Sequence, residues 1–129
     1  NTKVCLPYES PVRGLATSGW MGRSQSLGIA DAVTVLASSS ACADAAATVI
    51  ANNVNIEHPG IIRKPACDVK DDSDLGMHPV TVKVPFLPEK EVSRALRNGA
   101  ESAKALIRKN IIQSAYLSMQ EQTLVIENT

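Results

Sequence analysis

The sequence has few aromatic residues and no net charge, and each shortage excludes a class of partner. Lys and Arg together number 13, as do Asp and Glu, so no overall positive field attracts nucleic acid or anionic lipid. The aromatic residues are one Trp, two Tyr and one Phe, and they do not alternate with basic residues as a base-stacking surface requires. We therefore expect neither nucleic acid nor a membrane as a partner.

Cysteines and long apolar runs are also scarce. Cys5, Cys42 and Cys67 are an odd number without a C-x-x-C pair, which argues against a disulfide framework and a structural zinc site. No apolar run approaches the roughly 20 residues that span a bilayer, and no signal peptide is recognisable. We expect reduced thiols and a cytoplasmic location. Because the chain begins at Asn1 rather than Met, we expect a fragment, a processed product or a partial chain.

The apolar pattern predicts a mixed α/β (α+β) fold, a sheet with packed helices. Residues 1–129 would form one domain, or the C-terminal half of one. Segments rich in β-branched residues predict strands, and apolar residues at helical spacing predict helices. The expected strands are Val12–Ser18, Ala32–Ala37 and Pro79–Val84, with a closing hairpin of Ile112–Met119 and Thr123–Ile126; the expected helices are Ala41–Ala51 and Pro88–Ile107.

Two further features of the chain follow from its glycines and prolines. Asn55–Met77 contains Pro59, Gly60, Pro65 and an acidic cluster, so we expect a surface loop with little regular structure. Gly99 lies within the apolar stripe of the last long helix. Although glycine costs about 1 kcal/mol there relative to alanine, it lets the helix approach the sheet closely.

Asp44 and Thr48 are candidate metal ligands on the first helix. They are four positions apart, so they project from nearly the same side of the helix and their oxygens could share one hard cation. Ala41, Ala47 and Ala51 would line that face with methyl groups and leave room for a bulky ligand. Mg²⁺ often uses one or two carboxylates together with phosphate oxygens and water.

A structural interpretation of the same pair is left open. Asp44 would favour the positive end of the helix dipole, and the Thr48 hydroxyl would bond a carbonyl one turn earlier. The alanines would then permit close helix packing.

The loop Gly19–Gly28 (GWMGRSQSLG) is a candidate phosphate site. Its glycines, hydroxyls and Arg23 could hold a phosphate through backbone N–H groups and a guanidinium. Its spacing matches neither G-x-G-x-x-G nor a P-loop. The alternative is a wide turn between strands in which Arg23 is solvated.

Three segments in order, Ala16–Gly19 (ATSG), Ala32–Ala37 (AVTVLA) and Ala43–Thr48 (ADAAAT), resemble the C-terminal half of the ApbE-like flavin transferase superfamily. Over the whole chain the sequence is more similar to an uncharacterised ApbE-related branch than to the transferases themselves. The resemblance implies a Mg²⁺ ion held by Asp44 and Thr48, with FAD or FMN beside it. Thr17, Ser18, Gly19 and Arg23 would then contact the flavin nucleotide.

The chain departs from the transferase pattern in two places. Residues 23–31 (RSQSLGIAD) replace a segment that carries His, Asp-Pro and Thr-Gly in the transferases, and the N-terminal half with its G-G-D motif is absent. A missing half or a companion chain would have to supply it.

Three functions are compatible with these residues. The first is binding of a flavin nucleotide or similar small phosphorylated ligand with Mg²⁺, including FMN transfer by a Mg²⁺-dependent enzyme. The second is a non-catalytic binding or assembly module, and the third is a scaffold subunit of a larger redox enzyme. Whether the chain is an enzyme, and whether it forms a homo-oligomer, is left open.

Overall fold

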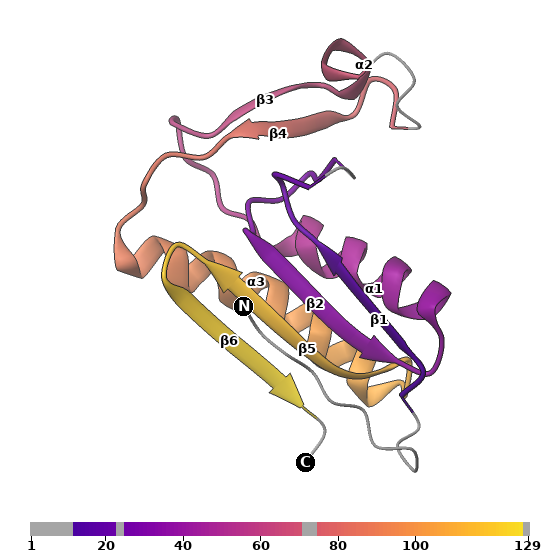
Figure 1. The fold of residues 1–129 in the computed structure, drawn as a ribbon. Helices are drawn as coiled ribbons and strands as arrows, with labels where there is room; N and C mark the ends of the chain where they lie inside the picture. Colours follow the sequence, from indigo (N-terminus) through magenta and orange to yellow (C-terminus); the bar gives the residue numbers. More distant parts are fainter. Residues whose placement is uncertain (1–11, 23–24, 71–74, 128–129) are drawn as a thin grey trace.

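The computed structural model describes residues 12–22, 25–70 and 75–127, which form two β-sheets and three helices (Figure 1). The strands are β1 (Gly14–Ser18), β2 (Ala32–Ala37), β3 (Ile62–Pro65), β4 (Pro79–Lys83), β5 (Ile112–Met119) and β6 (Gln122–Glu127). The helices are α1 (Ser40–Asn53), α2 (Ala66–Val69) and α3 (Glu89–Arg108). The predicted mixed α+β fold is confirmed.

The larger sheet has the order β1-β2-β5-β6, and every neighbouring pair is antiparallel. Helices α1 and α3 lie side by side against one face of this sheet (Figure 1). Their apolar stripes and the inward residues of the strands form a single core cluster. Neither helix covers the other face, so the described residues leave one side of the sheet open.

The ends of the helices follow from local chemistry. Ser39 caps α1, since its side-chain oxygen accepts a hydrogen bond from the backbone N–H of Cys42 at 3.1 Å. Pro88 precedes α3, whose first turn carries Glu89 and Glu91 and whose last turn carries Arg108. These charges complement the helix dipole at both ends.

Helix α1 ends at Asn53 without a left-handed cap. The capping residue is Val54, with a φ of −74°, and its N–H bonds back to the helix. The Oδ1 atom of Asn52 accepts hydrogen bonds from the Ser26 hydroxyl at 3.2 Å and from the Leu27 N–H at 2.9 Å. Asn52 therefore fastens the preceding loop to α1.

The closing hairpin is confirmed, with a shorter turn than expected. Gln120 and Glu121 are the two turn residues, at φ values of 43° and 71°, and Gln122 already belongs to β6. Two positive φ values in succession match the twist of the flanking strands.

The prediction of a surface loop at Asn55–Met77 is wrong. The segment contains β3 and α2, and β3 pairs with β4 in a separate two-stranded sheet. Figure 1 shows this hairpin beyond one end of the larger sheet. The sequence did not reveal β3 because its four residues alternate between exposed and half-buried positions and gain their order from the β4 backbone.

No helix in the described part of the chain is both long and apolar enough to cross a membrane.

Candidate functional site

The open face of the larger sheet carries a set of hydroxyl side chains. Side chains along a strand alternate between the two faces of a sheet. Val33 and Leu117 point to the core, so their neighbours Thr34 and Tyr116 point to the open face. The register places Thr17, Thr34, Tyr116 and Val125 in one row across all four strands.

A pocket of about 310 Å³ lies on this face. It is lined by five hydroxyl-bearing residues and two aliphatic ones: Thr17, Thr34, Tyr116, Ser118, Thr123, Leu15 and Ala32. Every strand of the sheet contributes at least one hydroxyl. The pocket is therefore a product of strand order and register, and not of any single segment.

The hydroxyls differ in how they are engaged. The Oγ1 atoms of Thr17 and Thr34 are 2.8 Å apart and share a hydrogen bond. Within the described residues the side-chain hydroxyls of Tyr116, Ser118 and Thr123 have no hydrogen-bond partner. Each hydroxyl can donate one hydrogen bond and accept others. Three free groups of this kind can recognise a ligand that offers both donors and acceptors.

The lining of this pocket carries no charge. None of its seven residues has a carboxylate, an ammonium, a guanidinium or an imidazole group. A phosphate would therefore have no cation to pair with in this pocket. An uncharged group can bind there without burying a charged side chain. The arrangement is suited to binding by hydrogen bonds and apolar contact.

The predicted metal ligands lie on the opposite side of the sheet. Asp44 and Thr48 are exposed residues of α1, which packs on the face away from Thr17. The Thr48 hydroxyl donates to the backbone carbonyl oxygen of Asp44 at 3.0 Å. This is the hydrogen bond that the structural interpretation of the pair requires.

The expected methyl-lined ligand face around this pair is wrong. Ala47 and Ala51 are completely buried in the core, and only Ala41 is exposed as expected. Val49, on the same helix, is 48% exposed. Small side chains on α1 permit its close packing against the sheet and α3, so the alanines serve the core and not a ligand hollow.

The side chains of Asp44 and Thr48 offer few oxygen donors. They supply one exposed carboxylate and one hydroxyl that already donates to the helix backbone. Among the described residues no group of three or more His, Cys, Asp or Glu side chains is placed to hold a metal ion. Mg²⁺ at this pair would therefore depend on oxygens from a ligand and from water.

The structure separates the residues predicted to bind a phosphate. Thr17 faces the open side, while Ser18 pairs with the buried Val33 and faces the helices. The N–H groups of Trp20 and Gly22 are bonded to the carbonyls of Ala30 and Gly19, so neither is free for an anion. The predicted contact of Arg23 lies outside the described residues. Of the three predicted residues that the structure describes, Thr17 alone lines the open-face pocket.

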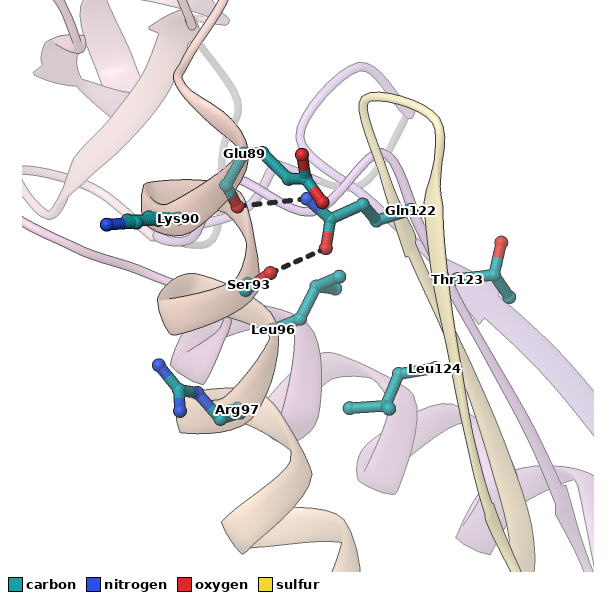
Figure 2. Close-up of a pocket in the computed structure, with 8 residues that line it drawn as sticks. All are labelled: Glu89, Lys90, Ser93, Leu96, Arg97, Gln122, Thr123 and Leu124. Carbon is teal, nitrogen blue, oxygen red and sulfur yellow. Dashed lines mark hydrogen bonds between the residues drawn. The ribbon is translucent and has the colours of Figure 1, made fainter.

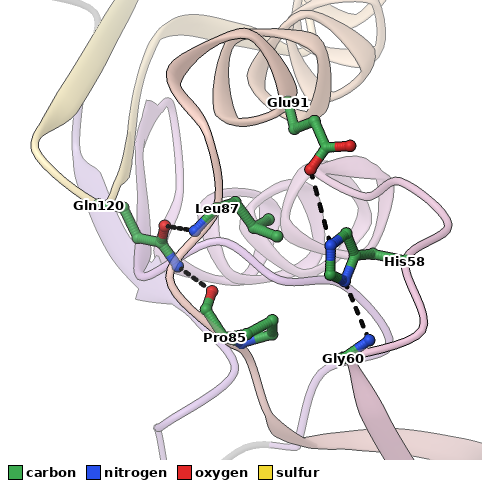
Figure 3. Close-up of polar contacts among 6 residues, drawn as sticks. All are labelled: His58, Gly60, Pro85, Leu87, Glu91 and Gln120. Atoms are coloured by element: carbon green, nitrogen blue, oxygen red, sulfur yellow. Dashed lines mark hydrogen bonds and ion pairs between the residues drawn. The ribbon is translucent and has the colours of Figure 1, made fainter.

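A second polar cluster joins α3 to the loop before β3 (Figure 3). His58 Nδ1 accepts a hydrogen bond from the Gly60 N–H at 2.9 Å, so the neutral ring carries its proton on Nε2. That Nε2 lies 3.8 Å from Oε2 of Glu91, a buried oxygen without a hydrogen-bond partner among the described residues. His58 therefore links the loop before β3 to α3.

Gln120 anchors the chain that leads into α3, as Figure 3 also shows. Its Oε1 accepts from the Leu87 N–H and its Nε2 donates to the Pro85 carbonyl, both at 2.8 Å. Its own backbone N–H donates to Oδ2 of Asp31 at 2.9 Å. This one side chain fixes the hairpin turn to the start of α3.

Arg63 ties the smaller sheet to the rest of the molecule. Its Nη2 donates to Oδ1 of Asn55 at 2.6 Å, and its Nε donates to the Leu27 carbonyl at 3.4 Å. Burial lowers the pKa of this guanidinium below its usual value, yet it stays protonated at neutral pH. Arg63 is thus a structural cation.

Sequence reasoning missed four of the five pocket hydroxyls. Tyr116 and Ser118 alternate with Ala115, Leu117 and Met119, and this period of two could have placed them on a polar face. Thr34 was missed because it lies in Ala32–Ala37, whose nearly continuous apolar residues predict a strand buried on both faces. The meeting of these residues with Thr123 depends on strand order, which the sequence pattern does not contain.

In a comparison with protein-family models, the family described as AbpE bacteria matches residues 1–125. No curated protein and no solved structure matches the chain. The matched family is different from the ApbE flavin transferases, so the predicted membership of that superfamily is wrong. The three short segments that resemble the flavin transferases were therefore not enough to identify the family.

Proposed function

The chain belongs to the AbpE bacteria family, and we propose that it is a binding domain whose open sheet face receives the uncharged, hydrogen-bonding part of a small ligand. One observation carries the proposal: hydroxyls from all four strands gather in one uncharged pocket. The lining holds no imidazole, carboxylate or thiol, so binding and not catalysis is assigned to this face.

The size of the pocket favours part of a ligand over a whole dinucleotide. Its volume of about 310 Å³ is near the lower end of the roughly 300–1,000 Å³ range of ligand pockets. Tyr116 and Leu15 offer apolar surface for a planar ring, and the free hydroxyls can meet the polar edge of that ring. A flavin nucleotide is a ligand of this chemistry: its ring system is uncharged and its phosphates would lie outside the pocket.

The experiment is a calorimetric titration of riboflavin, FMN and FAD into the protein. We expect binding of all three with similar affinity, because no cation in the pocket distinguishes a phosphate. Thr34→Val and Tyr116→Phe each remove one hydroxyl and keep the shape of the side chain. Each should weaken binding by about 1 kcal/mol.

Thr48→Val is the matched control, since it removes an exposed hydroxyl on α1, away from the pocket. It should leave binding unchanged. The proposal fails if no flavin compound binds, or if Thr48→Val weakens binding while Thr34→Val and Tyr116→Phe do not. A clear preference for FMN and FAD over riboflavin would show that the phosphate is recognised, and would move the site away from this face.

The alternative of an assembly module is supported by two apolar side chains on the same face. Leu15 is 46% exposed and Val125 is 47% exposed, on opposite edge strands of the sheet. A second chain lying on this face would bury both. Light scattering of the wild-type protein and of Leu15→Ser tests this: an oligomer that dissociates in the variant favours assembly.

A further inference from the structure

The edge of β6 has backbone groups without a strand partner. Strand β6 pairs with β5 on one side, and in the described residues no strand pairs with it on the other. A strand at the edge of a sheet presents unpaired N–H and C=O groups, which form a template for a further strand. The six residues of β6 offer a template about 20 Å long.

A groove runs between this edge and helix α3 (Figure 2). Its larger section has a volume of about 630 Å³ and is lined by Leu96 and Leu124 together with Lys90 and Arg97. Another section of about 490 Å³ lies between Lys104 and the last three residues of β6. The groove therefore follows the strand edge for most of its length.

One end of the groove is held in a fixed shape. The Ser93 hydroxyl donates to Oε1 of Gln122 at 2.8 Å, and Nε2 of Gln122 donates to the Glu89 carbonyl at 3.0 Å. Figure 2 shows these two bonds joining the first turns of α3 to the start of β6. Beyond them Leu96, Arg97 and Leu124 line the groove.

Positive charge lines the helix side of the groove. Lys90, Arg97 and Lys104 recur every seven residues, so they lie on one side of α3 over about 21 Å. Lys104 is 3.7 Å from Glu101, but Lys90 and Arg97 have no carboxylate within ion-pair distance among the described residues. Two acidic residues also line the groove: Glu89 near Lys90 and Glu127 near Lys104.

We propose that the β6 edge and the α3 groove bind an extended acidic segment of another protein, which adds a fifth strand to the sheet. Its backbone would pair with the free edge of β6. Alternate side chains would point toward α3, where their carboxylates meet Lys90 and Arg97 and their aliphatic stems cover Leu96 and Leu124. The intervening side chains would extend the open face beside Thr123 and Val125.

The charges argue against a second copy of this chain as the occupant. Two antiparallel copies of β6 would be related by a twofold axis perpendicular to the sheet, which places both α3 helices on the same face. Arg97 would then face its own copy, and Lys90 would face Lys104. Like charges brought together in this way disfavour pairing of identical edges.

The test uses a synthetic eight-residue peptide of alternating Val and Glu, and a matched peptide with Lys in place of Glu. Fluorescence anisotropy measures binding, and hydrogen exchange followed by NMR locates it. We expect the acidic peptide to bind more tightly than the basic one, with slower exchange at β6 amides and unchanged exchange at β1. Binding should weaken as salt is raised.

Charge-reversal variants distinguish binding in the groove from nonspecific electrostatic attraction of the acidic peptide to the protein surface. The double variant Lys90→Glu/Arg97→Glu should weaken binding of the acidic peptide about tenfold or more and bind the basic peptide better than the wild type does. Arg94→Glu is the control, because Arg94 is an exposed residue of the same helix that lines neither section of the groove. It should change binding less than twofold.

Four results would overturn the proposal. The first is no binding of the acidic peptide at about 1 mM, which corresponds to a binding free energy of about −4 kcal/mol. The second is binding without protection of β6 amides, and the third is an equal loss of binding in Arg94→Glu. The fourth is a dimer of the protein alone in which β6 amides are protected, which would assign this edge to a second copy.

Discussion

Replacing Gly99 by alanine sets two opposing effects against each other in the centre of α3. A Cβ atom built at Gly99 contacts Cγ2 of Val54 and lies 3.1 Å from Cδ2 of Leu117. Both neighbours are completely buried, so neither can move into solvent. The close approach of α3 to α1 and the sheet therefore depends on the missing side chain.

The sizes of the two effects decide the expected sign. Alanine in place of glycine gains about 0.8–1 kcal/mol of helix propensity. An extra methyl group in a packed core costs about 1–3 kcal/mol. Val54 is β-branched and stiff at χ1, so it cannot easily rotate away from the new methyl group. We expect a net loss of about 1 kcal/mol in the free energy of unfolding.

Urea denaturation followed by circular dichroism measures this loss, and a thermal melt should show a Tm lowered by about 4 °C. The Val54→Ala background supplies the control, because it removes the methyl group that the new Cβ meets. In that background Gly99→Ala should be neutral or stabilising, which gives a coupling energy above about 0.5 kcal/mol. A Gly99→Ala protein at least as stable as the wild type would refute the reasoning, as would the same loss in both backgrounds.

Three further outcomes follow from single contacts. Ser39→Ala removes the cap on the Cys42 N–H and should cost about 1 kcal/mol in urea denaturation, whereas Ser39→Asp should cost little. Gln120→Ala leaves the buried Leu87 N–H without its acceptor and should cost about 1–3 kcal/mol, with faster exchange of that amide by NMR. Mg²⁺ alone should bind no more tightly than about 1 mM, since Asp44 offers one exposed carboxylate; micromolar binding lost in Asp44→Asn would contradict this.

The elements could be predicted where one local pattern dominates. The helix at α3 was evident because apolar residues at helical spacing, a preceding proline and an internal glycine all indicate the same structure. The β5–β6 hairpin was evident for a similar reason. By contrast β3 was missed, because the pairing of Arg63 and Lys64 with Thr81 and Val80 is supplied by a distant segment.

The sequence predicted less of the candidate site than of the fold. Asp44 and Thr48 share one helix face, as their spacing requires, and spacing alone could not show that the Thr48 hydroxyl bonds the helix backbone. Thr17 was selected with Ser18 and Gly19 as one motif. In a strand adjacent residues face opposite sides, so that motif cannot act as a unit once it lies in β1.

The sequence by itself determined the two long helices, the strands other than β3, and the residues of α3 that turn inward, because these depend on contacts within a few residues. Only the tertiary structure decided that the strands adopt the order β1-β2-β5-β6, that hydroxyls from all four meet on one face, and that β6 is left at an edge beside α3. These features require residues far apart in the sequence to become neighbours, as Thr34 and Tyr116 do. The pattern of residues within one strand does not specify which other strand it will pair with.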